Sequence, residues 1–357
     1  MGTQVECPNC GAVMVFDPGT QGLKCGYCGS DKGIDADQRA IEEKDLDSAP
    51  FLKGWDTSVQ TFQCESCGAT ITTERNITGE CPFCGSNFVR ELSKRQDIIR
   101  PENLVPFKIA RERANELFQR WIGRGCFRPG DLKRLKKLQK MSGIYLPFWT
   151  YDCRTHADWT AQSGYYYYET ETYTAYENGR HVRKTRQVRK VRWVPSRGRR
   201  DDTFDDTLIL ASKGIDEDIA EKVYPFHLNE LVPYKPDYLS GWMAEEYSIN
   251  VHEGWGKARE KVKGEVYQRC ARDVPGDTHR FLNVDTRFFD LKYKHILLPI
   301  WSAAYHYKKK LYHFLINGQT GEVQGEKPLS WLKIALAVAA GAAAAALLIF
   351  LYVNLAG

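Results

Sequence analysis

Eight cysteines in the first 84 residues have the spacing of metal ligands. They form four Cys-x-x-Cys pairs, which group into two sets with 14 and 13 residues between the inner cysteines. The predicted ligands are Cys7, Cys10, Cys25 and Cys28 in the first set, and Cys64, Cys67, Cys81 and Cys84 in the second. A tetrahedral zinc ion bound by four thiolates needs two such tight knuckles brought together from a distance. The sequence therefore predicts two Zn2+ ions as cofactors.

The expected role of this zinc is structural. All four positions of each predicted site are protein thiolates, so no position remains for a catalytic water. A unit of about 25 residues buries too small a core to fold alone, so the metal supplies its folding free energy. Iron or a redox role is the alternative, but a thioredoxin-like pair needs a βαβ pattern that the sequence lacks.

Two similar segments must position these knuckles. Residues 1–30 and 60–92 each hold two Cys pairs around strand-like residues, which predicts two zinc ribbons. The charged residues 31–59 between them predict a helical linker. Reduced thiolates indicate the cytosol, and no signal peptide is visible before them. Zinc ribbons bind either protein or nucleic acid, and the sequence leaves this choice open.

The body that follows contains recurring motifs. Leu-Val-Pro followed by an aromatic residue occurs at 104–107 and again at 231–234, and Leu-Pro-x-Trp occurs at 146–149 and 298–301. Each first motif precedes a helical pattern, at 109–123 and 254–272, and each second motif precedes an alternating, strand-like sequence. We expect two related α+β halves, residues 100–225 and 226–328. Chance recurrence of short apolar strings is the alternative.

A long β-hairpin is predicted in the first half. Strand-like residues 165–176 and 181–194 flank Asn178-Gly179, which is typical of a type I′ turn. With that turn, Glu171 faces Arg186 across the strands and the charges attract. A second hairpin is predicted over residues 311–323.

Residues 333–354 predict a transmembrane helix. Ile334–Val353 carries no charge and is about 30 Å long as a helix, which matches a bilayer core. Lys327 and Lys333 lie on its N-terminal side, so the positive-inside rule places the body in the cytoplasm, on the inner face of the cell membrane. A buried, Ala-rich soluble helix is the alternative. Small residues four apart would also suit an oligomer through this helix.

Charge is nearly balanced overall but uneven along the chain. Lys and Arg number 50 against 45 Asp and Glu, which does not by itself predict a nucleic-acid binder. Residues 180–200, however, hold ten Lys or Arg. This stretch could contact lipid headgroups or nucleic acid, or neighbouring Glu and Asp could neutralise it.

Motifs of enzymes are missing from the sequence. It contains no GxxxxGK[ST], HExxH or GxSxG, and the eight histidines lack metal-ligand spacing. We therefore predict no catalytic residues and no enzymatic activity.

The ordered series of motifs resembles a known family. Tandem four-cysteine ribbons, LPFWTYDC, GYYYYETETYTAY, RWVPSRGRRDDTFDDTLILAS and INGQTGEVQGEKP before an apolar terminal helix are similar to a group of bacterial zinc-ribbon membrane proteins. Members are often labelled primosomal replication helicases, although this sequence lacks a nucleotide-binding motif. The resemblance implies an association with envelope-stress systems that contain phage-shock-protein-A-like and flotillin-like (SPFH) proteins.

Together these features predict a multidomain α+β protein with a β-rich body. The leading hypothesis is a tail-anchored scaffold that recruits a protein partner to the cytosolic membrane face, where tethering raises the partner's local concentration. The alternative is a membrane-tethered nucleic-acid-binding protein that uses the ribbons and the basic stretch.

Overall fold

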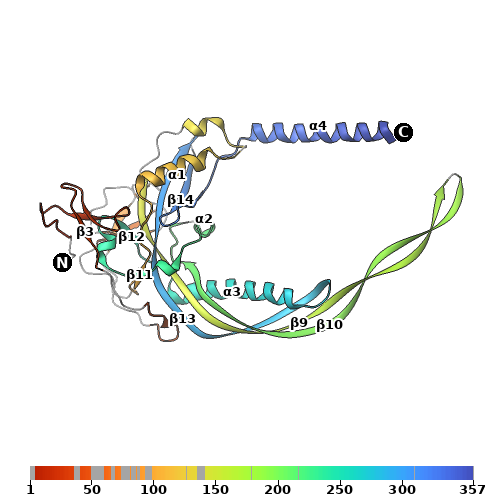
Figure 1. Cartoon of the computed structure of the whole chain (residues 1–357), viewed down its shortest axis with the longest axis horizontal. Helices are drawn as coiled ribbons and strands as arrows, with labels where there is room; N and C mark the ends of the chain where they lie inside the picture. Colours follow the sequence, from red (N-terminus) through yellow and green to blue (C-terminus); the bar gives the residue numbers. More distant parts are fainter. Residues whose placement is uncertain are drawn as a thin grey trace.

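The computed structural model describes residues 5–35, 41–49, 60–65, 69–73, 81, 86, 89–92, 99–125, 127–134, 141–177, 179–215, 217–308 and 310–356. Over these residues the chain is a β-rich α+β protein with four α-helices, the last of them apolar. Figure 1 shows a body from which a long curved β-hairpin and the C-terminal helix extend toward the same side. The N-terminal strands lie at the opposite end of the body (Figure 1).

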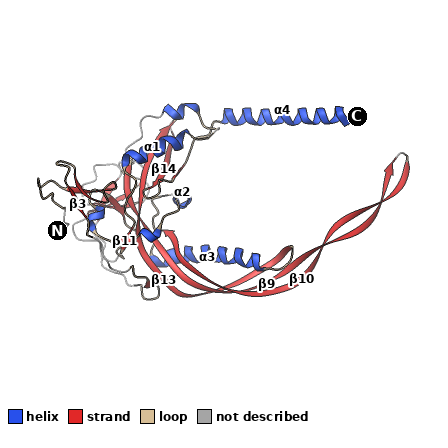
Figure 2. Ribbon diagram, viewed as in Figure 1, coloured by secondary structure: helices blue, strands red, loops and turns tan. Residues whose placement is uncertain are grey.

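Three long strands form a curved arm. They are β9 (Ser142–Glu177), β10 (Arg180–Leu210) and β13 (Thr278–Tyr307). β9 is the middle strand and pairs antiparallel with both neighbours, and Figure 2 shows the strands curving away from the body together. The pairing with β13 ends where Thr278 faces Gly164, so β9 and β10 continue alone as a two-stranded hairpin.

The predicted hairpin and its register are confirmed. Glu177 pairs with Arg180 across the turn, and Glu171 pairs with Arg186. An Arg186 guanidinium nitrogen lies 3.4 Å from a Glu171 carboxylate oxygen. Gly179 has φ of +79°, the left-handed conformation that a type I′ turn requires. The second predicted hairpin is formed by β14 and β15, with Gly321 at φ +81° in its turn.

Both neighbours of β9 are bulged at the same level of the arm. The register shifts after Phe204 in β10 and after Phe289 in β13. Asp206 and Asp290 both have φ of 51° at these shifts, a conformation that Asp tolerates better than most residues. Bulges bend a strand and increase its twist, so this level is where the arm turns away from the body.

A long helix, α3 (Val251–Asp273), lies along the base of the arm. Asn250 caps it, since its side chain accepts hydrogen bonds from the His252 and Glu253 backbone N–H groups. Its buried stripe repeats every four residues and is narrow: Gly254, Ala258, Val262, Val266 and Cys270. A side chain at Gly254 would collide with Tyr151, so the glycine lets the helix approach the sheet closely.

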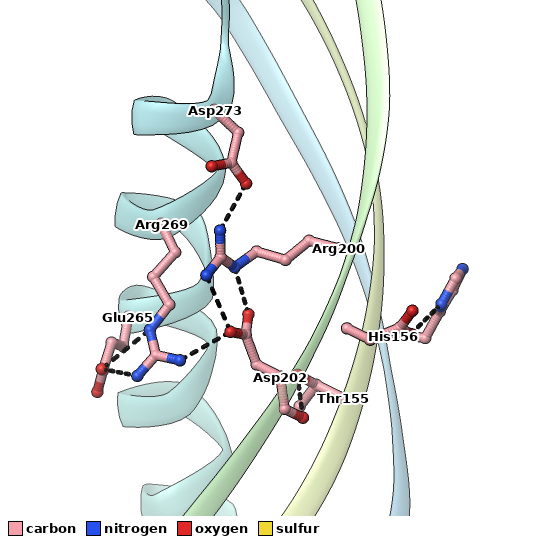
Figure 3. Close-up of polar contacts among 8 residues, drawn as sticks. Thr155, His156, Arg200, Asp202, Glu265, Arg269 and Asp273 are labelled. Carbon is pink, nitrogen blue, oxygen red and sulfur yellow. Dashed lines mark hydrogen bonds and ion pairs between the residues drawn. The ribbon is translucent and has the colours of Figure 1, made fainter.

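Ion pairs fasten α3 to β10, as Figure 3 shows. The Asp202 carboxylate is only 7% exposed and accepts from Arg200 of its own strand at 2.5 Å and from Arg269 of α3 at 2.8 Å. Arg200 also reaches Asp273 at the end of α3, at 2.6 Å. The base of the arm is thus a sheet with a helix clamped on it.

An aromatic core joins the arm to the rest of the body. Phe118 stacks on Phe314 at 4.2 Å between ring centroids, and Phe107 stacks on Trp242 at 4.1 Å. Trp301 meets both Phe107 and Trp242 edge-on. The remaining elements of this body are α1 (Arg111–Gly123), α2 (Glu217–Lys222), β8 (Asn103–Leu104), β11 (Val232–Pro233), β12 (Met243–Glu245), β14 (Lys310–Asn317) and β15 (Val323–Gly325).

The N-terminal third is built of short strands. They are β1 (Met14–Asp17), β2 (Gly22–Cys25), β3 (Asp31–Gly33), β4 (Lys44–Asp45), β5 (Gln60–Cys64), β6 (Thr70–Thr73) and β7 (Val89–Leu92). β1, β2 and β3 form a sheet of their own. β5, β6 and β7 belong to the large sheet, because β6 pairs with β12 of the body.

The helical linker predicted over residues 31–59 is wrong where the structure describes that segment. Asp31–Gly33 pairs with β2, and Lys44–Asp45 pairs with β13 of the arm. The charged composition favoured a helix, but long-range strand pairing overrides this weak local preference. The domain boundaries of the sequence analysis otherwise stay predictions.

The C-terminal helix, α4 (Trp331–Ala356), leaves the body after a short non-helical segment. Its 22 residues Trp331–Tyr352 are long and apolar enough to cross a membrane, and none of the span is buried inside the protein. At about 33 Å, that length matches the hydrocarbon core of a bilayer.

Candidate metal centre

The four cysteines of the first set come together in space. Their Sγ atoms all lie within 4.8 Å of one another. Cys7 Sγ is 3.4 Å from Cys28 Sγ, and Cys10 Sγ is 3.5 Å from Cys25 Sγ. Four sulfurs around one zinc ion at about 2.3 Å lie roughly 3.8 Å apart, so the observed spacing suits a tetrahedral thiolate site. We call these four residues the N-terminal cysteine cluster.

Two knuckles of the same shape present these sulfurs. In each, the first cysteine's carbonyl accepts a hydrogen bond from the glycine four residues later, which is Gly11 or Gly29. These glycines have φ of +72° and +77°. A side chain would strain that conformation, which explains the glycine directly after the second cysteine of each pair.

The surroundings of the cluster favour thiolates at some of its sulfurs. A hydrogen bond from the Ser30 hydroxyl lowers the pKa of Cys28 to about 6. The backbone N–H of Cys28 lowers the pKa of Cys25. The Ala12 N–H favours the Cys10 thiolate, but desolvation and the other three sulfurs outweigh it and raise the pKa of Cys10 to about 12. Zinc would hold all four as thiolates, because a coordinating thiol is deprotonated.

The cluster is docked on the body. The Trp242 indole N–H donates to the Phe16 carbonyl at 2.9 Å, and the Ser240 hydroxyl donates to the Met14 carbonyl at 2.7 Å. The Gln21 side chain donates to the Phe107 carbonyl at 2.8 Å. These partners are up to 226 residues apart in the chain. No sequence motif marks them, which is why sequence reasoning missed them.

The second cysteine set is described in part. Cys64 and Cys81 are both buried, whereas Cys67 and Cys84 lie outside the described residues. Cys64 and Cys81 each donate their backbone N–H to the carbonyl of the residue five positions later, at 2.9 Å and 2.8 Å. Cys7 and Cys25 make the same bond, each at 2.8 Å. All four predicted knuckles therefore share one closing hydrogen bond.

An acidic group that the sequence did not predict lies at the bulged level of the arm. Glu43, Asp152 and Asp205 come from three distant segments and bring one oxygen each within 4.8 Å of the others. Burial raises the pKa of Asp152 to about 7. The Lys294 ammonium lies 2.7 Å from Asp206 and 3.4 Å from Glu43, so it already supplies positive charge at this place. We interpret the group as an ion network that joins segments of the arm.

Comparison with known proteins gives one relative and no function. The uncharacterized protein YdjG of Bacillus subtilis (strain 168) is 27% identical over 346 residues, which cover 92% of this chain and 91% of that protein. The similarity therefore extends over nearly the whole chain rather than over the cysteine pairs alone. No family model matches the chain, and no solved structure matches it.

Proposed function

We propose that this protein is a membrane-tethered zinc-ribbon scaffold that recruits a protein partner to the cytosolic face of the cell membrane. The observation that carries the proposal is the separation of its two ends. The N-terminal cysteine cluster lies at the end of the body opposite to the side on which α4 extends (Figure 1). A cluster in that position faces away from the bilayer, where a soluble partner can reach it.

The bare surface of α4 supports the membrane anchor. Residues Trp331–Tyr352 carry large apolar side chains with no cover in the protein, and water would oppose such exposure. Lys327 and Lys333 lie at the end of the span next to the body, which by the positive-inside rule puts the body in the cytosol. The reducing cytosol also keeps cysteine thiols available for zinc.

A second zinc site is part of the proposal. The closing hydrogen bond shared by all four knuckles, and the burial of Cys64 and Cys81, support Cys64, Cys67, Cys81 and Cys84 as its ligands. Because β6 pairs with β12, this site would join the sheet of the body. Each zinc would then fix a short segment to the same rigid support.

We further infer that residues 100–225 and 226–328 are related halves. The recurring motifs meet each other in the fold, since Leu104 pairs with Val232 and Leu146 pairs with Leu298. The tryptophans of the two Leu-Pro-x-Trp motifs make reciprocal contacts. Trp149 donates to the Ile249 carbonyl before α3, and Trp301 donates to the Ile109 carbonyl before α1, both at 2.8 Å.

Reciprocal contacts of this kind interlock the halves, because each half fixes the start of the other half's helix. The body then acts as one stiff unit between the cysteine end and the anchor. Such stiffness suits a scaffold, which must hold its binding end at a fixed place relative to the membrane.

The surface around the N-terminal cysteine cluster is where we expect the partner to bind. Tyr27 lies between Cys25 and Cys28 and is 86% exposed. Exposed tyrosines are frequent in protein interfaces, where a rigid ring buries a large area. The resemblance described above suggests an SPFH-type or phage-shock-protein-A-like partner.

The test is a pull-down of tagged full-length protein from nuclease-treated membranes in mild detergent. We expect one protein to copurify with the wild type and to be lost with Tyr27→Ala. The matched control is Lys32→Ala, an exposed change on the neighbouring strand that should retain the partner. Zinc content should be equal in all three proteins. A partner retained equally by both variants would contradict the proposed binding surface.

The alternative function is a membrane-tethered nucleic-acid binder. One observation favours it, which is the ten Lys or Arg in residues 180–200, most of them on the exposed hairpin. The same pull-down without nuclease treatment distinguishes it. Retained nucleic acid whose binding falls steeply with salt, together with no protein partner, would replace the scaffold by this function.

A further inference from the structure

The outer part of the long hairpin, residues 165–192, has no support from the rest of the protein. β13 reaches only to Gly164, and α3 ends at Asp273, close to the start of β13. From Tyr165 onward two strands stand alone, with both faces and both edges open (Figure 1). We call residues 165–192 the distal hairpin. An isolated two-stranded hairpin is marginally stable in water, so a surface that binds it would also stabilise it.

The distal hairpin is strongly basic. It holds seven Lys or Arg against three Glu, a net charge of +4. This charge is divided unequally between its two faces, because side chains of a strand alternate and residues paired across the strands share a face. The register therefore assigns each side chain to one face or the other.

All three glutamates lie on one face. On that face Lys190 lies 2.6 Å from Glu169 and 3.2 Å from Glu171. Arg186 also pairs with Glu171. The acidic residues of this face are thus engaged by its own basic residues, and much of its charge is satisfied within the hairpin.

The opposite face contains no acidic residue at any position of the distal hairpin. We call it the Tyr/Arg face, and it consists of Tyr166, Tyr168, Thr170, Thr172, Thr174, Tyr176, His181, Arg183, Thr185, Gln187, Arg189 and Val191. All of these side chains except Val191 are exposed. Arg189 lies over the Tyr166 ring at 4.3 Å, which keeps its guanidinium on the surface of this face.

We propose that the Tyr/Arg face binds the anionic headgroups of the bilayer in which α4 is anchored. Guanidinium groups bind phosphate with two parallel hydrogen bonds, and tyrosines favour the membrane–water interface. The negative surface potential of the cytoplasmic leaflet attracts basic segments held close to it. α4 holds the hairpin there, and the hairpin extends toward the same side as α4 (Figure 1).

The hairpin lies on the bilayer and does not cross it. Seven Lys or Arg and three Glu exclude it from the hydrocarbon core. It therefore lies at headgroup level, which requires α4 to tilt relative to the body about residues 326–330. That segment is neither helix nor strand, so its backbone can accommodate such a tilt. The protein then has two membrane contacts, one through the hydrocarbon and one on the surface.

This inference rests on the membrane anchor of the proposed function. The experiment uses full-length protein in lipid nanodiscs, either of phosphatidylcholine alone or with about one-third phosphatidylglycerol. Amide hydrogen exchange of residues 165–192 is the readout. We expect exchange to slow by at least about threefold in the anionic discs and to recover in high salt.

Two variants with the same loss of charge test the choice of face. Arg183→Gln with Arg189→Gln changes the Tyr/Arg face, and Arg186→Gln with Arg192→Gln changes the opposite face at the same spacing. We expect the first variant to lose the slowing and the second to keep it. Unchanged exchange of α3 and unchanged zinc content would show that both variants fold.

Three outcomes would overturn the proposal. Equal exchange in the two kinds of disc would exclude binding to anionic lipid. Equal loss in both variants would show a diffuse charge effect without a binding face. Slowing that appears only on addition of duplex DNA would assign the face to nucleic acid. A protein that fails to enter the discs would instead contradict the anchor of the proposed function.

Discussion

The N-terminal cysteine cluster and the distal hairpin are both small β structures that protrude from the body, but they are stabilised in different ways. The cluster has four sulfurs placed for a metal ion and is fastened to the body through Ser240 and Trp242. The distal hairpin has neither a third strand nor a helix beyond Gly164. Neither unit buries enough apolar surface to be stable alone. The difference teaches that one is complete within the chain once metal binds, whereas the other gains from an external surface.

Removal of zinc should have the largest effect and should affect the cluster alone. Structural zinc contributes on the order of 10 kcal/mol of binding free energy to such sites. We expect Cys25→Ser to lower the metal content from about two to about one zinc ion per chain and to abolish amide protection over β1 and β2. Elemental analysis and hydrogen exchange measure both. Tyr168→Ala in the distal hairpin should leave zinc unchanged; a loss there would show that the two protrusions are coupled.

Loss of docking should have the next largest effect. Trp242→Ala removes the stacking on Phe107 and the hydrogen bond to Phe16, at a cost of about 3 kcal/mol. We expect the cluster to keep its zinc but to move relative to the body, so that protease cleaves between the cluster and the arm more quickly. Trp242→Phe, which retains the ring contact, should lie between wild type and Trp242→Ala. Loss of zinc in Trp242→Ala would show that docking and metal binding are one event.

Weakening the base of the arm should have the smallest effect, about 1–2 kcal/mol, since both arginine partners of Asp202 are partly exposed. Burial opposes ionisation of Asp202, but hydrogen bonds from Arg200 and Arg269 outweigh it and hold its pKa below the usual range. This contribution is complete above the unfolded pKa of about 3.9 and is lost as pH falls through the lower folded pKa. Asp202→Asn should therefore destabilise α3 at neutral pH and differ less from wild type in acid.

Protection factors of α3 and of the distal hairpin measure this effect at both pH values. If the hairpin depends on its base, its protection should fall with that of α3. Protection of the hairpin that stays constant while α3 loosens would show that the two parts of the arm are independent. That result would sharpen the contrast between a clamped base and a bare outer part.

Local patterns in the sequence determined several parts of this protein. The spacing of Cys7, Cys10, Cys25 and Cys28 predicted a cluster that the structure brings together. Asn178-Gly179 fixed the register of the long hairpin, because a two-residue turn leaves a single antiparallel pairing. The apolar span of α4 and the helices α1 and α3 followed from composition and periodicity. In each case the deciding interaction joins residues close in sequence.

Tertiary structure alone decided how these parts are joined. Lys44–Asp45 is a strand because β13 offers it a partner about 250 residues away, although its charged surroundings favoured a helix. The docking of the cluster on Trp242 and the ion network around Lys294 also connect segments more than 100 residues apart. Such contacts depend on which surfaces meet once the sheet has formed, and a short stretch of sequence does not encode that. The sequence thus determined the units and their chemistry, and the fold determined their support.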